Sequence, residues 1–387
     1  MNSTAARPLE PVAAPLARAL PAWVYDHPEM ARLEYERLLK PSWQIVCHVS
    51  SLGRCGDFVT LEVGPDSVVA LRTSQGEIQV FHNVCRHRGA RILEGAGNCP
   101  GAITCPYHGW SYKLSGELLG MTARETFPPL DRTQLALKPV RSQVLFGFVF
   151  MCLAGNPRSL EEIWAGVAAE FAPHRFADMR PLGSMYIEHW DCDWKIAMDN
   201  YLESYHVPIG HPGLNRMFTP DYEDQLNLPG VARGISWLRE RPSSRWSERM
   251  YQKLVGGVSA DLPEPHRRRW SFYSMLPNLG IDVFPDQMDF FQVLPRGPGK
   301  CTIRGASFAH PDERREMRVV RYLSTRINRQ VQREDEFLCR RVQRGLASGS
   351  YEPGPLSRLE NCMQEFHDLL RERIPEARQP SPPLRFS

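Results

Sequence analysis

Two short loops, each pairing a cysteine with a histidine, constrain this chain more than any other feature. One residue separates Cys85 from His87, and two residues separate Cys105 from His108. The second pair lies in the segment Cys-Pro-Tyr-His-Gly-Trp, which is rich in aromatic residues, glycine and proline. Such a loop can turn tightly and can keep water away from a redox centre. Together the four side chains offer two thiolates and two imidazoles to one metal centre.

A [2Fe–2S] centre of the Rieske type needs this ligand set, with two cysteines on one iron and two histidines on the other. The same set also binds zinc, and short cysteine–histidine spacings are common in zinc modules. A chance grouping among 10 cysteines and 12 histidines is a third alternative, and the composition of the second loop argues against it. We therefore expect Cys85, His87, Cys105 and His108 to hold a Rieske-type [2Fe–2S] cluster.

Both loops resemble those of the Rieske non-haem iron oxygenases, in the catalytic (alpha) subunit, and the resemblance extends over residues 20–370. The family implies an oxygenase with a mononuclear Fe(II) in addition to the cluster, and a homotrimeric assembly. It also implies electrons from NAD(P)H, delivered by a separate reductase with or without a ferredoxin. The chain carries no glycine-rich dinucleotide fingerprint, so we expect the reductase to be another protein.

Length, composition and charge limit the number of domains, the partners and the location that we expect for this protein. At 387 residues the chain is long enough for two hydrophobic cores. The net charge of +3 gives no argument for a nucleic-acid or anionic-membrane partner. The longest apolar run, residues 144–155, is too short to span a bilayer. Prolines interrupt residues 1–19, which favours a flexible arm over a signal peptide. The scattered cysteines fit free thiols in a reducing cytosol, so we expect a cytoplasmic protein.

We expect an α+β fold in two parts. Short strand-like runs separated by turns predict a small antiparallel β domain at residues 42–155, which carries the cluster loops. Residues 156–375 are expected to form the catalytic mononuclear-iron domain. The order of elements alone predicts only an α+β fold, and the resemblance implies a helix-grip architecture, an antiparallel sheet with a long C-terminal helix. The runs expected to form this part are four strands at 270–276, 281–284, 288–294 and 301–308, and helices at 193–207, 312–346 and 355–371.

Three other segments are assigned from their patterns. Residues 1–41 are expected to be an N-terminal arm and helix that packs with the catalytic domain. Residues 219–254 are polar, with scattered proline and glycine, and predict loops and short helices that could form a lid. The end of the chain, residues 376–387, is expected to be a disordered tail.

A second cluster of metal-binding residue types lies around position 206. His206 and His211 flank a Pro–Gly break that could bring the two imidazoles together. Asp199, Glu203 and His206 are spaced by four and three, which predicts that they share one face of the 193–207 helix. An acidic pair and two histidines around a helix end rarely occur together by accident.

The long C-terminal helix offers a carboxylate. Its predicted apolar stripe is interrupted at Asp335; the stripe is formed by Ile327, Val331, Leu338 and Val342. A carboxylate on a buried stripe costs several kcal/mol unless it is paired or binds metal. An ion pair with a nearby arginine is the alternative. Glu334 and Glu336 lie off the stripe and are expected to be solvated.

Two histidines and one carboxylate form the facial triad of non-haem Fe(II) oxygenases, which leaves positions open for O2. The family has its third ligand in a similar Glu-Asp pair that precedes a Val-Gln-x-Gly-Leu segment, which here occupies residues 342–346. The resemblance therefore assigns His206, His211 and Asp335 to the mononuclear iron.

The resemblance also implies a bridge between the two metal centres. In the family an acidic residue three positions before the first ligand histidine reaches a cluster histidine of the neighbouring subunit, which head-to-tail packing brings near. Glu203 has this position, and His108 resembles the cluster histidine that faces the bridge. Asp199 is the rival, and a solvated helix carboxylate is the alternative for Glu203. The family more often has Asp here, and Glu leans towards enzymes that act on quaternary ammonium compounds.

We expect the terminal oxygenase component of a Rieske system, which uses O2 to hydroxylate or oxidatively demethylate a small aromatic compound. The alternative is a monooxygenase of a carnitine-, betaine- or choline-like quaternary ammonium compound. A non-catalytic Rieske electron carrier and a zinc-binding protein are remote alternatives. Five aromatic residues of the later strands suit an apolar pocket or a cation–π cage, although core packing is the simpler interpretation of each: Phe272, Tyr273, Phe284, Phe290 and Phe291.

Overall fold

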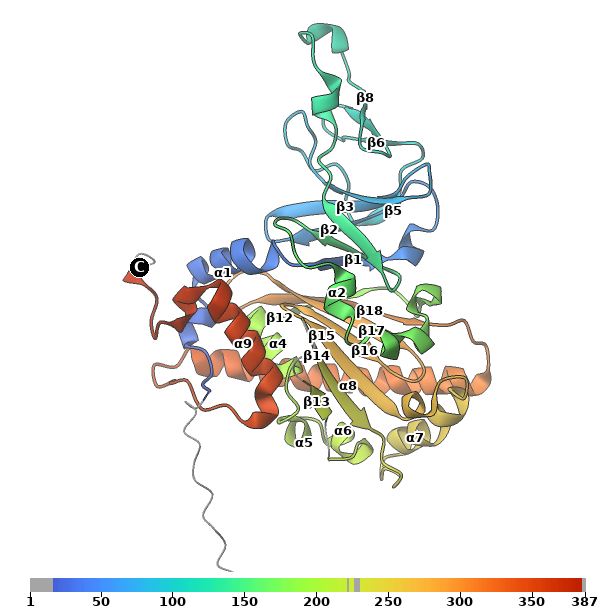
Figure 1. Cartoon of the computed structure of the whole chain (residues 1–387), viewed down its shortest axis with the longest axis vertical. Helices are drawn as coiled ribbons and strands as arrows, with labels where there is room; N and C mark the ends of the chain where they lie inside the picture. The colour runs from blue at the N-terminus through green and yellow to red at the C-terminus, as the bar shows by residue number, and fades with distance from the viewer. Residues whose placement is uncertain (1–16, 221–222, 226–229, 385–387) are drawn as a thin grey trace, which may run out of the picture.

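The structure is a computed structural model that describes residues 17–220, 223–225 and 230–384. Most of the predicted N-terminal arm and part of the 219–254 segment lie outside the described residues. Figure 1 shows an elongated molecule with small sheets at one end and a large sheet with its helices at the other. No helix among the described residues combines the length and the apolar character that crossing a bilayer requires.

Three small antiparallel sheets carry the cluster loops. Their strand orders are β1-β10-β9, β4-β3-β2-β5 and β6-β7-β8. The strands are β1 Gln44–His48, β2 Asp57–Val63, β3 Asp66–Arg72, β4 Ile78–His82, β5 Ala96–Asn98, β6 Ala102–Thr104, β7 Ser111–Lys113, β8 Leu118–Gly120, β9 Arg141–Leu145 and β10 Phe148–Cys152. One loop follows β4 and the other joins β6 to β7, and β6 and β8 lie at the end of the molecule farthest from the large sheet (Figure 1).

The large sheet is antiparallel and has eight strands. Its order is β11-β18-β17-β16-β15-β14-β13, and β12 also pairs with β18. The strands are β11 Arg180–Pro181, β12 Tyr186–Trp190, β13 Glu223–Gln225, β14 Val231–Trp237, β15 Arg269–Met275, β16 Leu279–Val283, β17 Met288–Pro295 and β18 Cys301–Ala309. The four strands predicted between residues 270 and 308 are confirmed, and so is the α+β fold class.

Helices cover this sheet and its edge. Their bounds are α1 Pro28–Glu34, α2 Leu160–Trp164, α3 Ala168–Phe171, α4 Trp194–Tyr201, α5 Val207–Gly210, α6 Pro212–Met217, α7 Trp246–Val258, α8 Arg315–Leu346 and α9 Asn361–Arg373. The long C-terminal helix is therefore confirmed as α8, which spans 32 residues. Figure 1 shows α8 lying along the sheet, with α4, α5 and α7 close to it.

Alternation along the strands gives the sheet two different faces. Tyr273, Ile281 and Phe290 point to one face, where they pack with Phe148 and Trp164 at the base of the cluster-bearing part. The residues between them, at the even positions of β15 and β16, point to the opposite face. That second face lies under α8 and forms one wall of the cavity described below.

The lid prediction for residues 219–254 is wrong for the described part of that segment. β14 is an inner strand of the sheet, paired with both β13 and β15, and α7 begins at Trp246. The polar pattern arises because one face of β14 borders a cavity rather than a packed core. This segment is therefore part of the scaffold.

Both ends of the described chain pack onto the large sheet's own core. Leu20, Trp23 and Met30 share a buried cluster with Trp194 of α4 and Phe366 of α9. The segment expected to be a disordered tail is ordered at its start, where a 3-10 turn, η10 Pro375–Arg378, buries Ala377.

Candidate metal centres

The two cluster loops close with the same backbone pattern. In each, the cysteine amide donates to the carbonyl five residues later, at 2.8 Å for both Cys85 and Cys105. The glycine amide four residues after each cysteine returns a bond to the cysteine carbonyl, at 3.0 Å for Gly89 and 3.1 Å for Gly109. These glycines have φ of +74° and +69°, a conformation that a side chain would strain. One turn type thus occurs twice, and each copy presents one cysteine and one histidine.

The cysteines lie inside these loops and the histidines lie at their tips. Cys85 and Cys105 are buried, whereas His87 and His108 are partly exposed, with their rings 4.7 Å apart between centroids. Nδ1 of His87 is buried and has no hydrogen-bond partner among the described residues. Buried polar atoms are nearly always paired, so an orphan nitrogen in a loop that also carries a buried cysteine fits a metal ligand better than a core histidine.

Two aromatic residues that the sequence analysis did not single out complete this site. The Tyr112 hydroxyl lies 3.2 Å from Sγ of Cys85 and accepts the Arg86 amide at 3.0 Å. Burial raises the pKa of Tyr112, so the hydroxyl keeps its proton and can donate it to a thiolate. The Trp110 ring stacks on His87 at 4.8 Å. Trp110 ends the second loop segment and Tyr112 lies two residues beyond it, and this nearness in sequence is the signal that could have found them.

The second candidate site begins where α4 ends. The prediction of a helix to residue 207 is wrong, because the Leu202 amide closes the last turn of α4 on the Met198 carbonyl at 3.0 Å. The Glu203 carboxylate then accepts the His206 amide at 2.9 Å. Local side-chain bonds of this kind compete with helix continuation. Glu203 therefore contacts His206 because the helix ends before both residues, and not because they share a helix face.

Asp199, the rival of Glu203, lies in a different network. Its carboxylate accepts the Tyr25 hydroxyl at 2.8 Å and lies 2.9 Å from Nε2 of His367. These partners belong to the N-terminal segment and to α9. The expectation that Asp199 shares a face with Glu203 and His206 is therefore wrong. Asp199 instead connects α4 to the N-terminal segment and to α9.

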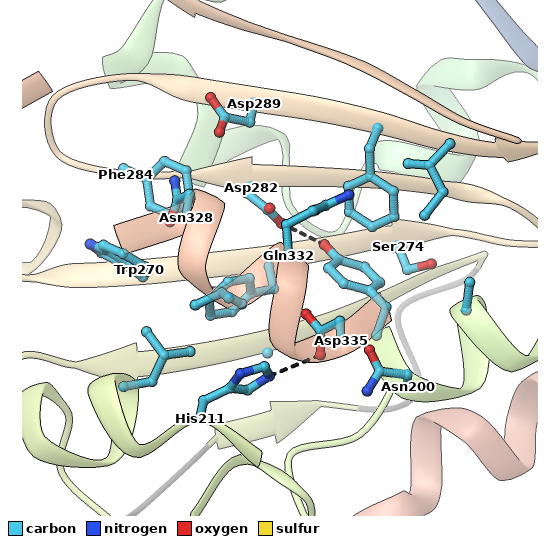
Figure 2. A pocket seen from close by; sticks show the side chains of 18 of the residues that line it. Asn200, His211, Trp270, Ser274, Asp282, Phe284, Asp289, Asn328, Gln332 and Asp335 are labelled. Atoms are coloured by element: carbon cyan, nitrogen blue, oxygen red, sulfur yellow. Dashed lines mark hydrogen bonds and ion pairs between the residues drawn. The ribbon is translucent and has the colours of Figure 1, made fainter. Parts of the chain in front are cut away.

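Three ligand atoms converge beside α8. Nε2 of His206 and Nε2 of His211 are 3.1 Å apart, and Oδ1 of Asp335 lies 2.9 Å from the second and 3.7 Å from the first. Figure 2 shows the contact between His211 and Asp335. Among the described residues this is the one group of three such side chains whose ligand atoms all lie within 4.8 Å of one another. The predicted triad is thus brought together by the fold.

The outward nitrogens of both imidazoles face carboxylates. Nδ1 of His206 is 2.6 Å from Glu203, and Nδ1 of His211 is 2.9 Å from Glu334. Ionised carboxylates only accept hydrogen bonds, so each Nδ1 must carry a proton, and in the neutral imidazole each Nε2 then presents a lone pair. Two lone pairs and a carboxylate then point at one space, which is unfavourable unless a cation fills it. This donor set suits Fe(II) with open coordination positions.

The electrostatics of the site also favour positive charge. Burial lowers the pKa of His206, but Asp335 and Glu203 outweigh burial and raise it to about 9. The pKa of His211 is also raised by Asp335 and Glu334 against the effect of burial. Burial alone would raise the pKa of Asp335, and the two histidines lower it instead. A metal cation supplies the charge that protons would otherwise provide.

The prediction that Glu334 is solvated is wrong. Besides its contact with His211, it accepts the side-chain amide of Gln330, one turn earlier on α8, at 2.8 Å. Two consecutive positions of α8 therefore supply a candidate ligand, Asp335, and the partner of another candidate ligand, Glu334.

The predicted apolar stripe of α8 is wrong at its end, because Val342 is half-exposed.

A cavity of about 550 Å³ lies beside the converging atoms, between the sheet and α8. Phe272, Phe284 and Phe291 line it. Tyr273 and Phe290 do not, because they lie on the opposite face of the sheet, in the core. The sequence could name the aromatic residues but could not separate pocket from core, since that depends on which face of each strand meets α8.

Comparisons with known proteins agree over nearly the whole chain. A family model described as the Rieske [2Fe-2S] domain matches residues 42–135, and one described as the ring hydroxylating alpha subunit (catalytic domain) matches residues 176–376. The chain is 30% identical over 377 residues to choline monooxygenase, chloroplastic, of Arabidopsis thaliana, which covers 93% of this chain and 84% of that protein.

Solved structures share the fold. A quaternary ammonium Rieske monooxygenase, described for carnitine oxidation and inter-subunit electron transfer, superposes with a TM-score of 0.78 at 22% identity, over 92% of this chain and 96% of that one. Naphthalene 1,2-dioxygenase from Rhodococcus sp. superposes with a TM-score of 0.75 at 21% identity, over 92% and 94%. The overall fold therefore does not separate these two substrate classes.

Proposed function

The chain belongs to the Rieske non-haem iron oxygenases as an alpha subunit, and on that premise we propose that it hydroxylates a methylated ammonium compound. Members of the family are oxidoreductases whose alpha subunits carry a Rieske [2Fe–2S] cluster and a mononuclear iron, and they act with a reductase, O2 and an organic substrate. The substrate class, the site residues and the assembly of this chain are the content of the proposal.

The chemistry of the cavity wall carries the choice of substrate class. Trp270 and Phe284 meet edge to face, with centroids 4.5 Å apart, and Asp282 and Asp289 line the same cavity. Aromatic faces and carboxylates both attract a cation, whereas a neutral aromatic hydrocarbon would leave the carboxylates that line the cavity without a cationic partner. The match to choline monooxygenase over 93% of the chain supports the same class. Both observations favour the alternative of the sequence analysis over its first choice, an aromatic substrate.

His206, His211 and Asp335 would hold the mononuclear iron, and Cys85, His87, Cys105 and His108 would hold the cluster. When bound, the iron provides the site at which O2 is activated, and the cluster delivers electrons singly. Hydroxylating a methyl group consumes one O2, two electrons and two protons, and yields the hydroxymethyl product and water. The electrons come from NAD(P)H through the reductase.

Protein side chains would prepare the iron site for this reaction. Glu203 and Glu334 would keep both imidazoles in the tautomer that presents Nε2. α8 forms the wall of the cavity opposite the sheet, and this wall would limit access of bulk water to the reacting groups from that side.

We further propose a head-to-tail ring of three subunits. The cluster loops and α5 lie in different parts of the chain's long shape (Figure 1). Beside Glu203 the surface carries two exposed apolar residues, Tyr205 at 59% and Ile209 at 87% exposure. The cluster tip carries Tyr107, at 55% exposure. Burial of these residues between neighbours would bring His108 of one subunit towards Glu203 of the next. Light scattering should give three times the 44.2 kDa chain mass, and a fully active monomer would contradict the ring.

A single turnover tests the substrate class. Iron-replete protein is reduced without oxygen, then mixed with O2 and a panel of methylated ammonium compounds, aromatic acids and methoxy-aromatics. We expect a hydroxylated or demethylated ammonium product by mass spectrometry. Product from an aromatic compound alone would contradict the proposal.

A further inference from the structure

The wall of the cavity opposite α8 holds two carboxylates side by side. Asp282 of β16 and Asp289 of β17 are directly opposite in register, and Phe272 and Ser307 continue the same row on β15 and β18. All four residues line the cavity. Like charges at directly opposed positions destabilise a sheet, and burial makes their repulsion larger. The fold therefore holds two carboxylates together although their repulsion is unfavourable, and a positive charge between them would offset it.

Neither carboxylate has a cationic partner in the described part of the chain. Asp282 accepts the Tyr201 hydroxyl at 2.7 Å, and Asp289 accepts the side-chain amide of Gln287 at 2.8 Å. Figure 2 shows Asp282 and its bond, with Asp289 on the neighbouring strand. Burial raises the pKa of Asp282 to about 8 and that of Asp289 to about 7, and the nearby Asp289 and Asp335 raise that of Asp282 further. The ionised forms of both carboxyl groups are thus disfavoured, because no nearby positive charge among the described residues stabilises them.

A separate feature also indicates a missing ligand. Gln287 is 2% exposed and lines the cavity, and its side-chain carbonyl oxygen has no hydrogen-bond partner among the described residues. Buried acceptors without partners are uncommon and require an explanation. Trp270 and Phe284 add an aromatic corner on the same wall. Acceptors, carboxylates and ring faces all favour a positively charged group.

The two arginines that line the cavity, among the described residues, do not offer it a buried, unpaired positive charge. Arg233 lines the cavity but is ion-paired with Glu170, and Arg329 lies on an exposed position of α8. A carboxylate joined closely to the substrate nitrogen would therefore face Asp282 and Asp289 without a buried, unpaired arginine in the described cavity wall to bind it. Its desolvation and repulsion would oppose binding.

We propose that Asp282 and Asp289 form the recognition site for the positive charge of the substrate, and that they select a methylated ammonium cation without a carboxylate next to its nitrogen. A choline-like amino alcohol has this chemistry, and glycine betaine does not. This inference rests on the proposed function and specifies which member of the substrate class the cavity accepts. Asp282 and Asp289 would act by binding, since neither belongs to the group of converging ligand atoms.

Binding measurements on the whole iron-loaded protein, without oxygen, test the proposal. Calorimetry compares choline with its neutral carbon isostere 3,3-dimethylbutan-1-ol and with glycine betaine. We expect choline to bind at least about tenfold more tightly than either compound. In Asp282→Asn and in Asp289→Asn the preference for choline over the isostere should fall by about tenfold. Asparagine keeps the size of the side chain, so the loss would report charge.

Asp286→Asn is the matched control. Asp286 is a buried carboxylate in the turn between the same two strands, but it accepts the Tyr251 hydroxyl at 2.9 Å and does not line the cavity. This variant should keep the full preference for choline. Iron content and melting temperature, measured for all three variants, separate a loss of charge from a loss of fold.

Three outcomes would overturn the inference: an unchanged preference in both cavity variants, an equal loss in the control, or tighter binding of glycine betaine than of choline. These outcomes differ from failure of the proposed function. If methylated ammonium compounds are turned over while the cavity variants keep their preference, only this inference fails. If aromatic compounds alone are turned over, the proposed function fails.

Discussion

The cluster loops and the iron site differ in how far along the chain they gather their side chains. Cys85 and Cys105 sit in two copies of one turn, separated by the short strands β5 and β6, which belong to different sheets. The proposed iron site joins the non-helical segment after α4 to the middle of α8, with His211 and its partner Glu334 123 positions apart. The first site depends on local backbone bonds, and the second depends on how α8 packs against the sheet.

This difference has consequences for how each site can fail. Each cluster loop closes through its own amides and a glycine with positive φ, so it needs little from the rest of the molecule. Each imidazole of the iron site depends on a carboxylate that is not a candidate ligand, Glu203 or Glu334. We therefore expect the iron site to be sensitive to changes outside its three converging residues, and the cluster site to be sensitive mainly to its own loops.

The largest expected effect comes from separating the two sites onto different chains. Cys105→Ser should abolish the cluster, His211→Ala should abolish iron binding, and each protein alone should be inactive. In co-assembled mixtures about one quarter of the subunit junctions would pair an intact cluster with an intact iron, so about that share of activity should return if electrons cross between subunits.

Steady-state product formation, with visible absorbance for the cluster and metal analysis for the iron, measures this complementation. Mixtures of each variant with itself serve as controls. Mixed assemblies that stay inactive, with both metals confirmed in the appropriate chains, would show that one chain must supply both centres.

Glu203→Gln should have the next largest effect. Glutamine can still accept the Nδ1 proton of His206 but removes the negative charge that holds it and that would face the neighbouring cluster. We expect turnover to fall by about 10- to 100-fold with the cluster spectrum unchanged. Glu203→Asp keeps the charge and should recover part of the rate. Equal rates for Gln and Glu at this position would contradict a bridging role.

Glu334→Gln should weaken iron binding with less effect on turnover once iron is restored. Its carboxylate orients His211 but does not belong to the group of converging atoms. We expect the dissociation constant for Fe(II) to rise by about tenfold, measured by competition with a chelator. Glu336→Gln is the control. Glu336 lies two residues after Glu334 on the same helix, near Arg340, and its substitution should leave iron affinity unchanged. If both variants lose iron equally, the contact with His211 is not the cause.

The smallest expected effect lies in the cluster loops. Tyr112→Phe removes the hydroxyl beside Sγ of Cys85 and should lower the reduction potential, because a hydrogen bond to sulfur stabilises the reduced cluster. One neutral hydrogen bond corresponds to about 20–60 mV for a one-electron couple. Potentiometric titration followed by visible spectroscopy measures the shift. A higher potential in the phenylalanine variant would contradict the donor role of Tyr112.

The sequence predicted more of the sites than of their surroundings. The four cluster residues and the three converging residues of the iron site were all named from spacing and resemblance. Glu334 was missed because its neighbour Asp335 filled the gap in the apolar stripe, and a residue one position away appeared to face solvent. The expectation that Asp199 shares a helix face with Glu203 and His206 was wrong, because the pattern assumed a helix that continues past residue 201, whereas α4 ends there and Glu203 accepts the His206 amide.

The sequence by itself determined the metal chemistry of this protein. Cysteine and histidine at fixed short spacings are local features, and a turn with its glycine is encoded where it forms. Only the tertiary structure decided what surrounds the iron site. The carboxylate pair of Asp282 and Asp289, the partners of the two histidines and the aromatic wall depend on which face of each strand α8 covers. That choice is made by packing across the whole sheet, because alternation along a strand defines two faces but does not say which one is buried against what.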